Sequence, residues 1–275
     1  MTHYLLAQWQ PQDALLIEGP RQHLLTKYYA PAHIPILTAP IVDLPPYWPI
    51  NAPPVVPEEM DDYLLASLRE HPNLWLSLTA ENEVDPGEFV AKYLTAVAFQ
   101  RDCQAWLDVR LCHFVSPHFV QPQVQKPVAA RFGNEFLLQE VTVALANAHE
   151  TEAATLLTTG SWLAENKPTV DYRVTLRLLD HAGTVVGQHD GLPIGPLLPP
   201  TTWNAGDLKP GYMAIPIKAS LPPGRYQLVL NLYDPATLAT IPHTTPGQST
   251  TDSPVSVAII TIDDTIGEQI KLTGN

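Results

Sequence analysis

With 275 residues, the chain is long enough for two domains, each with its own core, and its formal net charge at pH 7 is -13. The negative charge is spread over both halves, and neither half has a basic stripe that could neutralise phosphates. The composition therefore excludes nucleic acid and anionic membrane surfaces as partners. Proline is frequent, with 29 residues, and charged residues make up only 16% of the chain, which favours strands, turns and rigid connections over long helices.

Residues 1–120 are predicted to form an α/β domain. A short apolar run at 13–18 stops at Gly19-Pro20, as a buried strand does, and apolar residues at helical spacing lead to a second strand-like run at 34–37. This order is typical of a βαβ unit with a right-handed crossover and parallel strands. Further helices and strands are expected at 57–68, 74–78, 85–97 (with Asp85 as N-cap), 103–107 and 109–115.

The alternation of strands and helices predicts a three-layer α/β domain with Rossmann-like topology. One glycine, Gly19, follows the first strand, where a dinucleotide-binding fingerprint needs three to let a pyrophosphate approach the helix. We therefore expect neither nicotinamide nor flavin, and no other cofactor is indicated. Residues 40–57 contain seven prolines and the pair Tyr47-Trp48, which indicates an ordered excursion or a flap.

Cys103 and Cys112 are the only cysteines. If residues 101–107 and 109–116 form a tight antiparallel pair centred on Leu107-Asp108, the two thiols lie opposite each other, within disulfide reach. The alternative is two buried, unreactive thiols, because two cysteines alone do not define a disulfide framework.

Residues 121–128 are the best candidate linker, and beyond them the hydrophobic pattern changes to a period of two. Residues 129–265 are predicted to form an immunoglobulin-like antiparallel β-sandwich, followed by a tail at 266–275. The clearest strand follows the turn Pro222-Pro223-Gly224 and ends at Asp234-Pro235, because proline has no backbone donor. The expected strands are 136–146, 155–163, 172–179, 184–189, 213–217, 226–232 and 255–262.

No catalytic residue and no metal site are predicted. The ten histidines show no zinc-binding spacing, so His113 and His118, near one strand end, are interpreted as solvated or hydrogen-bonded side chains. Asp190 could orient His189 as in a catalytic triad, but neighbouring residues on a strand point to opposite faces and no serine elbow is present. The preferred interpretation of this pair is a turn at the end of a hairpin.

Four aromatic residues are candidates for binding a sugar. Flat rings can stack on pyranose faces while their polar tips form hydrogen bonds. The candidates are Tyr47, Trp48, Trp203 and Tyr212. The alternative for each is a packing role.

An ordered series of residues in the second half resembles the soluble C-terminal region of bacterial membrane glycosyltransferases of the dolichyl-phosphate-mannose protein mannosyltransferase type. The series is Trp162, Asp171-Tyr172, 180–183, His189-Asp190-Gly191, Trp203-Asn204-Ala205-Gly206, Leu221-Pro222-Pro223-Gly224, Tyr226 and Leu232-Tyr233-Asp234-Pro235. The N-terminal half is similar, with vaguer motifs, to the α/β segment that follows the last membrane helix in that family.

The resemblance implies a non-catalytic appendage that positions an acceptor or binds glycan. In the family the catalytic carboxylate lies in an early loop between membrane helices, a part that this sequence lacks, so no catalytic residue is carried over. No apolar run approaches the roughly 20 residues of a membrane span, and the sequence opens as though inside an element. We therefore expect a segment of a longer protein, on the extracytoplasmic face of the membrane and tethered by a missing N-terminal membrane region.

The expected partners are the membrane part of the parent chain and a glycan or polypeptide acceptor. Two other functions stay open. One is a self-contained carbohydrate-active hydrolase with a site between the two domains, where perturbed carboxylates would be expected. The other is a structural spacer.

Overall fold

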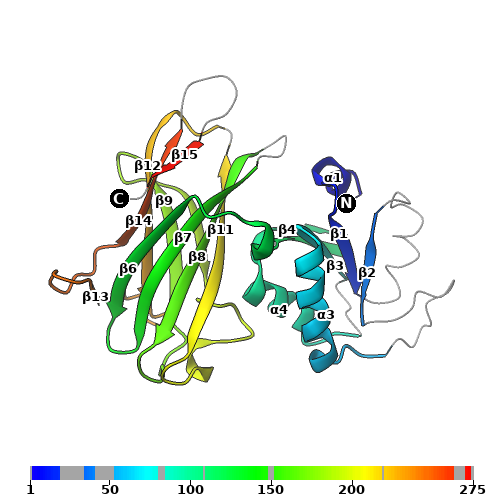
Figure 1. The fold of residues 1–275 in the computed structure, drawn as a ribbon, viewed down its shortest axis with the longest axis horizontal. Helices are drawn as coiled ribbons and strands as arrows, with labels where there is room; N and C mark the ends of the chain where they lie inside the picture. The colour runs from blue at the N-terminus through cyan, green and yellow to red at the C-terminus, as the bar shows by residue number, and fades with distance from the viewer. Residues whose placement is uncertain are drawn as a thin grey trace. The chain divides into compact units, whose positions relative to one another are not determined.

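The structure is a computed structural model, and it describes residues 2–18, 34–40, 53–79, 84–107, 109–147, 152–218, 220–262 and 270–273. The chain divides into two compact units, residues 1–119 (unit 1) and residues 120–275 (unit 2), each described here by itself (Figure 1). Strand β6 (Val124–Phe132) begins inside the predicted linker at 121–128, so most of that segment belongs to the first strand of unit 2. Within the described residues, no helix is long and apolar enough to cross a membrane.

Unit 1 is built around a five-stranded mixed sheet with the strand order β2-β1-β3-β5-β4. Its elements are α1 (Thr2–Gln8), β1 (Ala14–Glu18), β2 (Ile36–Ala39), α3 (Pro57–Glu70), β3 (Asn73–Thr79), α4 (Phe89–Val97), β4 (Phe99–Trp106), β5 (Val109–Val115) and the 3-10 helix η1 (Pro117–Phe119). Strand β1 pairs in parallel with β2 and β3, whereas β5 pairs antiparallel with β3 and β4. The sheet is therefore parallel on one side and antiparallel on the other.

The prediction of a three-layer, Rossmann-like α/β domain is wrong. After β3 and α4 the chain enters the hairpin of β4 and β5, and β5 returns beside β3 in the antiparallel direction. A few residues suffice to join antiparallel strands, whereas a parallel pair needs a crossover of a dozen or more. Half of the described residues are in strands and 16% are in helices, and these residues show no layering of helices on both faces of a parallel sheet.

The two longer helices form where the sequence predicts them. The buried residues Met60, Leu64 and Leu68 recur every four positions along α3 and make its apolar stripe. The N-cap residue of α4 is Glu88 rather than Asp85, which the sequence predicts. The two Asp85 carboxylate oxygens nevertheless accept hydrogen bonds from the backbone N–H groups of Phe89 and Val90 at the start of the helix, each at 2.9 Å.

A buried carboxylate fixes the start of β1 against β3. The Asp13 side chain is fully buried and accepts hydrogen bonds from Asn73 Nδ2 at 2.6 Å, from Trp75 Nε1 at 3.0 Å and from the backbone N–H of Gln10 at 3.0 Å. Asn73 continues the network, since its Oδ1 lies 3.0 Å from His113 Nε2. The His113 ring stacks on Trp75 with ring centroids 4.0 Å apart. The network therefore joins β1, β3 and β5 at one end of the sheet.

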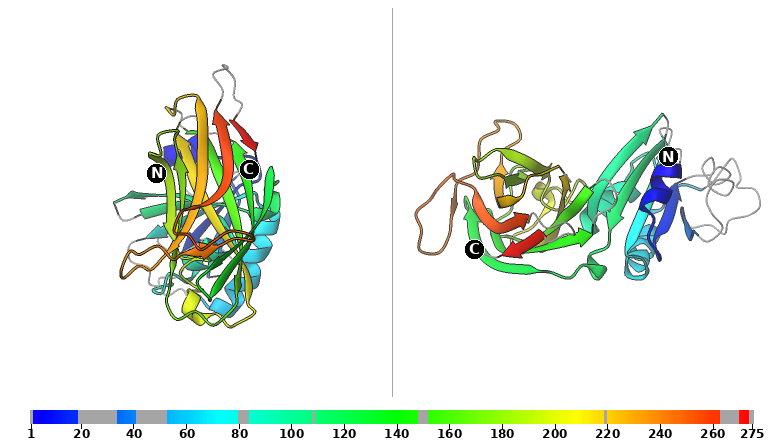
Figure 2. Two further views of the ribbon diagram at one scale, coloured as in Figure 1. Left: turned by 90° about the vertical axis from the view of Figure 1, so that its left-hand side faces the viewer. Right: turned by 90° about the horizontal axis from the view of Figure 1, so that it is seen from above.

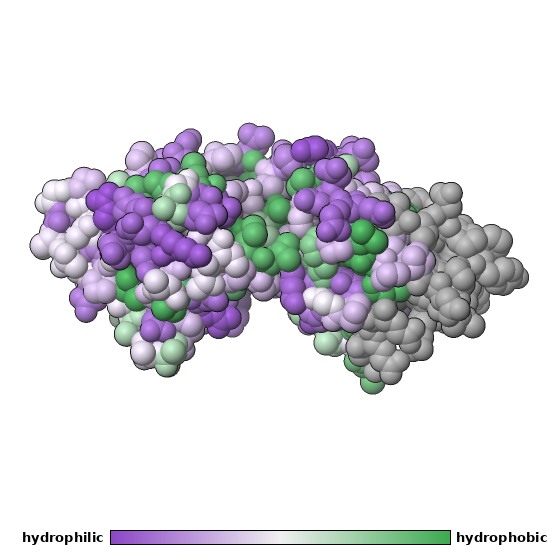
Figure 3. Space-filling model, turned by 90° about the horizontal axis from the view of Figure 1, so that it is seen from below, coloured by the Kyte–Doolittle hydropathy of each residue, from purple (hydrophilic) through white to green (hydrophobic). Residues whose placement is uncertain are grey.

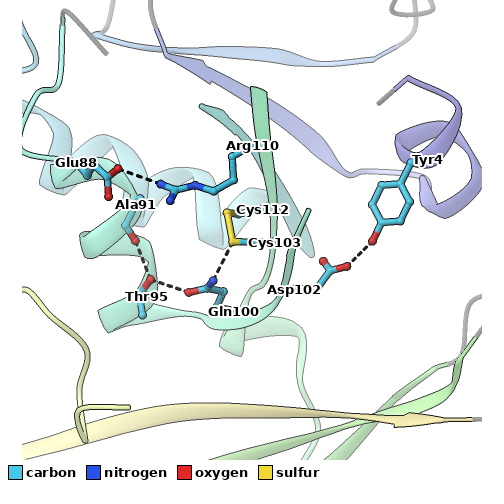
Figure 4. Close-up of a disulfide and its surroundings, with 9 residues drawn as sticks. All are labelled: Tyr4, Glu88, Ala91, Thr95, Gln100, Asp102, Cys103, Arg110 and Cys112. Atoms are coloured by element: carbon cyan, nitrogen blue, oxygen red, sulfur yellow. Dashed lines mark hydrogen bonds and ion pairs between the residues drawn. A yellow bond between two sulfur atoms is a disulfide. The ribbon is translucent and has the colours of Figure 1, made fainter. Parts of the chain in front are cut away.

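Cys103 and Cys112 form a disulfide between β4 and β5 (Figure 4). The two residues lie directly opposite each other in the antiparallel register, which is the placement that the sequence allowed for. Gln100 Nε2 donates a hydrogen bond to Cys103 Sγ at 2.9 Å, and Thr95 Oγ1 donates one to Gln100 Oε1 at 3.1 Å. The bond thus ties the hairpin together next to the C-terminal end of α4.

Replacing both cysteines with alanine is expected to lower the free energy of unfolding of unit 1 by about 2 to 3 kcal/mol, because the oxidised bond closes a short loop in the unfolded chain. Urea unfolding with and without a reductant measures this. The reductant should shift the midpoint of the native chain and leave that of the double variant unchanged. An unshifted midpoint for the native chain would contradict the prediction.

Unit 2 consists of two antiparallel sheets that face each other (Figures 1 and 2). One has the order β11-β8-β7-β6-β13 and the other the order β10-β9-β12-β14-β15. The elements after β6 are β7 (Phe136–Asn147), β8 (Glu152–Ala164), β9 (Arg173–Leu179), β10 (Val185–Gly191), the 3-10 helix η2 (Pro200–Thr202), β11 (Leu208–Lys218), β12 (Gly224–Tyr233), β13 (His243–Thr244), β14 (Val255–Ile262) and β15 (Ile270–Thr273). A sandwich is therefore present, but its two five-stranded sheets differ in strand number and order from the immunoglobulin pattern that the sequence predicts.

Aromatic side chains fill the space between the sheets of unit 2. Phe136 packs edge to face on Trp162 and on Trp203, with ring centroids 6.4 Å and 5.7 Å apart. Phe132 contacts Trp162 from β6, with centroids 5.9 Å apart. All four side chains are at most 1% exposed, so they form the centre of this core.

Two histidines make the stability of unit 2 depend on pH. Burial lowers the pKa of His189, against the opposing effects of the Asp190 charge and a hydrogen bond with the backbone of Ala214. Burial also lowers the pKa of His243, whose ring lies against Phe132. Both imidazoles are therefore harder to protonate in the folded chain than in the unfolded chain, where a histidine titrates near pH 6.5.

Unit 2 is expected to lose stability as the pH falls below about 6.5, because the unfolded chain then binds protons that the folded chain excludes. Above that pH the two histidines are neutral in both states and the effect vanishes. The free energy of unfolding changes with pH by at most about 1.4 kcal/mol per pH unit for each histidine. Chemical denaturation at pH 7.5 and 5.5 measures this change. In the double variant with His189→Gln and His243→Gln, the difference in stability between the two pH values should be smaller. Equal stability of the native chain at the two pH values would refute the prediction.

Candidate functional site

A polar pocket of about 280 Å³ lies on β9, β10 and β12. It is lined by Thr175, Arg177, Asp190, Asn231, Tyr233, Leu238 and Thr240. Along β9 the fully buried Val174, Leu176 and Leu178 alternate with the pocket residues. Because successive side chains of a strand point to opposite faces, the pocket lies on the outer face of this sheet, away from the sandwich core.

The strand register brings the polar residues of the pocket together. Thr175 lies on the central strand of the three, with Asp190 as its partner on β10 and Asn231 as its partner on β12. Arg177 follows two positions later on β9 and therefore points to the same face. Residues from three separate segments of the sequence thus form one continuous polar floor.

A turn after β12 supplies the edge of the pocket. The strand ends at Asp234-Pro235, and the chain folds back so that the Leu238 N–H donates to Asp234 O at 2.8 Å and the Asp234 N–H donates to Ala239 O at 3.0 Å. Thr240 then forms a bridge opposite Tyr233. This return brings Leu238, with 76% of its side chain exposed, and Thr240 to the pocket.

One carboxylate organises the pocket wall. The Tyr233 hydroxyl donates a hydrogen bond to Asp190 Oδ1 at 2.7 Å, and an Arg173 guanidinium nitrogen lies 3.8 Å from the same oxygen. Burial raises the pKa of Tyr233, and the bond to Asp190 raises it further. The phenol therefore stays neutral and holds its side chain in place beside the carboxylate.

Three buried polar atoms around the pocket have no hydrogen-bond partner among the described protein groups. They are Thr175 Oγ1, Arg177 Nε and Asn231 Oδ1. Thr175 is 3% exposed and Asn231 is 9% exposed, so these atoms belong to the floor. A buried polar group without a partner costs about 1 to 3 kcal/mol. The floor therefore offers one donor, one acceptor and one hydroxyl to a bound molecule.

The residues that line the pocket include a single carboxylate. Asp190 is the one carboxylate among its seven lining residues, whereas glycoside hydrolysis uses two carboxyl groups roughly 5 to 10 Å apart. No cluster of three or more metal-ligating side chains occurs among the described residues. Most of the side chains that line the pocket are hydrogen-bond donors or acceptors.

Two of the aromatic residues predicted from the sequence, Trp203 and Tyr212, are not among the residues that line this pocket. The Trp203 side chain is fully buried, and its Nε1 donates to Leu198 O at 2.9 Å, so its ring has no exposed face. Tyr212 lies on β11 in the other sheet, where burial raises its pKa. Tyr47 and Trp48 lie outside the described residues.

His189 and Asp190 lie on opposite faces of β10, which continues to Gly191 where the sequence suggested a turn. His189 is opposite the buried Leu176, whereas Asp190 is opposite Thr175 in the pocket. Alternation along β9 and β12 is the signal in the sequence that could have identified Thr175, Arg177, Asn231 and Tyr233 as outward-facing polar residues. On the face that Figure 3 shows, hydrophilic side chains cover much of unit 2, with hydrophobic patches between them.

No protein-family model matches the chain, and no curated protein matches it. Solved structures that resemble it include a β-glucuronidase from glycoside hydrolase family 2, at 13% identity over 61% of this chain and 15% of that chain, with a TM-score of 0.30. A putative β-galactosidase from Bacteroides fragilis is 13% identical over 61% of this chain and 21% of that chain, with a TM-score of 0.29. The C-terminal domain of wzt is 11% identical over 54% of this chain and 82% of that chain, with a TM-score of 0.32. The chain spans less than a quarter of either glycosidase, and likenesses this distant carry no argument about function.

Proposed function

We propose that this chain is a non-catalytic, extracytoplasmic module of a membrane glycosyltransferase of the dolichyl-phosphate-mannose protein mannosyltransferase type, and that it binds glycan or positions an acceptor for the membrane part. The polar pocket on β9, β10 and β12 carries the proposal. It combines donors, acceptors and hydroxyls with the Tyr233 ring and the apolar Leu238 side chain. Such a mixture suits a ligand that is rich in hydroxyl groups and also has apolar C–H faces.

The residues that carry the family resemblance support the same pocket. Asp190 belongs to the segment His189-Asp190-Gly191, and Tyr233 belongs to Leu232-Tyr233-Asp234-Pro235. Other members of the series build the scaffold behind it. The Tyr226 hydroxyl donates to Pro222 O at 2.5 Å, and Asp180 Oδ1 accepts the Ala182 and Thr184 N–H groups in the hairpin turn between β9 and β10.

The disulfide supports the proposed location. Disulfides form and persist in oxidising compartments such as the bacterial periplasm and the cell surface, and they are rare in the cytosol. The bond between Cys103 and Cys112 is therefore a feature that an extracytoplasmic domain would be expected to have. A module tethered to the membrane at that face would also lie next to lipid-linked sugar donors and their acceptors.

A glycan array with the purified chain tests the proposal against its rivals. The native chain should bind glycans on the array, and Tyr233→Ala and Asp190→Ala should each lose this binding. Asp252→Ala, at an exposed loop position, and Tyr212→Ala, on the other sheet, are the controls that should keep it. Absence of binding to every glycan would favour the spacer, and release of free sugar from the array would favour the hydrolase.

A further inference from the structure

We infer that the pocket on β9, β10 and β12 holds a single neutral sugar ring with adjacent hydroxyl groups, and that it discriminates against phosphates and acidic sugars. The inference rests on the proposed function, because it names the ligand class of that same site. Its first support is size. A volume of about 280 Å³ is just below the roughly 300 to 1,000 Å³ that small-molecule pockets span. Such a space suits one ring better than a longer oligosaccharide.

The second support is the arrangement of donors and acceptors on the floor. Arg177 Nε can only donate, Asn231 Oδ1 can only accept, and Thr175 Oγ1 can do both. Thr175 and Asn231 are direct partners on neighbouring strands, and Arg177 lies two positions from Thr175 on the same face. A ligand that satisfies all three must present donors and acceptors close together. Adjacent ring hydroxyls do so, because each is a donor and an acceptor at once.

The third support is the charge around the pocket. The charged oxygens of a phosphate or carboxylate group can only accept hydrogen bonds, so a negative group placed against Arg177 offers no donor to the nearby Asn231 oxygen. It would also face the Asp190 carboxylate, whose Oδ1 already accepts the Tyr233 hydroxyl. An Arg173 guanidinium nitrogen lies 3.8 Å from the same carboxylate oxygen. Arg177 and Asp190 are the charged residues of the lining, so their charges balance. A neutral hydroxyl can donate to the carboxylate, whereas a negative group cannot.

Titration of the full chain with methyl glycosides of mannose, glucose and galactose, followed by protein NMR, tests the inference. Shift changes should be confined to β9, β10, β12 and the turn after β12. Inorganic phosphate and methyl glucuronide, used at the same concentrations, should produce none there. Thr175→Val, which keeps the shape of the side chain and removes its hydroxyl, should weaken binding roughly tenfold, and so should Asn231→Leu.

Thr158→Val is the matched control. Thr158 Oγ1 is also buried without a partner among the described groups, but it lies on β8 in the other sheet. This variant should bind like the native chain, and the unfolding midpoint of each variant reports whether it is folded. If Asn231→Leu does not fold, the binding of the monosaccharides by Thr175→Val alone tests the assignment of the site.

The outcomes separate the inference from the proposed function. If phosphate or methyl glucuronide binds at the pocket more tightly than the neutral glycosides, the inference of a neutral ligand is wrong. The pocket would still be a ligand-binding site. If Tyr233→Ala loses binding on the array but the native chain binds no monosaccharide, the ligand is not a single ring. The proposed glycan-binding function would then still stand. Monosaccharide binding that Thr175→Val leaves unchanged overturns the assignment of the site. Absence of binding in both experiments removes the inference and the proposed function together.

Discussion

Replacing Trp203 with alanine is expected to lower the free energy of unfolding of unit 2 by about 3 to 5 kcal/mol, the usual cost of removing a large buried aromatic side chain. The ring is fully buried, packs edge to face on Phe136 and donates a hydrogen bond to Leu198 O. Its removal leaves a cavity in the aromatic core and a carbonyl group without its donor. Equilibrium denaturation, followed by circular dichroism and near-ultraviolet fluorescence, measures the loss.

Trp203→Phe is the matched variant, because it keeps a six-membered aromatic ring for Phe136 and loses only the five-membered ring of the indole with its N–H. It should cost clearly less than the alanine change. The two hypotheses for this residue predict opposite results. A sugar-stacking tryptophan would lose glycan binding on substitution and keep its stability, and that combination would refute the core assignment.

Trp203 shows why exposure could not be predicted from the sequence. The residue stands just after Pro199-Pro200 in a connection without regular hydrophobic alternation, a setting in which a loop residue is usually expected at the surface. Burial of such a side chain depends on which strands the loop crosses. Here the short helix η2 places the indole beside Phe136 of β7, a contact between residues that are far apart in the sequence.

The sandwich strands were predictable because they depend on local alternation. The hairpin of β9 and β10, its turn at 180–183 and the strand β12 all lie close to where the sequence places them. The pairing of β9 with β12 and the order of strands in each sheet are not local properties. The pocket depends on that register, because Asp190, Thr175 and Asn231 meet only when three strands lie side by side.

Unit 1 shows the opposite case, in which correct local features gave a wrong fold. Helices α3 and α4 and strands β1, β3 and β5 occur where periodicity predicts them. Alternation of helices and strands does not determine strand direction, however, and the connection between β4 and β5 is too short for a parallel crossover. The same antiparallel pairing places Cys103 opposite Cys112. Connection length, which restricts two strands to a hairpin, was therefore the physical signal that decided against a Rossmann-like domain.

Replacing Asp13 with alanine is expected to lower the free energy of unfolding of unit 1 by about 2 to 4 kcal/mol. The change removes the acceptor of Asn73 Nδ2 and of Trp75 Nε1, and a buried donor that loses its partner costs about 1 to 3 kcal/mol. Trp75 is fully buried, so water cannot replace the carboxylate at its indole N–H without opening the core. Urea denaturation of the variant measures the loss.

Two further variants separate the hydrogen bonds of Asp13 from a general effect of removing an acidic residue. Asp13→Asn keeps one acceptor oxygen but turns an N–H₂ group toward one of the donors, so its cost should fall between those of the native chain and of Asp13→Ala. Asp62→Ala removes an exposed carboxylate of α3 and should change stability by no more than about 0.5 kcal/mol. If Asp13→Ala were as stable as Asp62→Ala, the carboxylate would not anchor β1. The parallel pairing of β1 with β3 would then depend on the apolar contacts of Leu15, Leu16 and Ile17 alone.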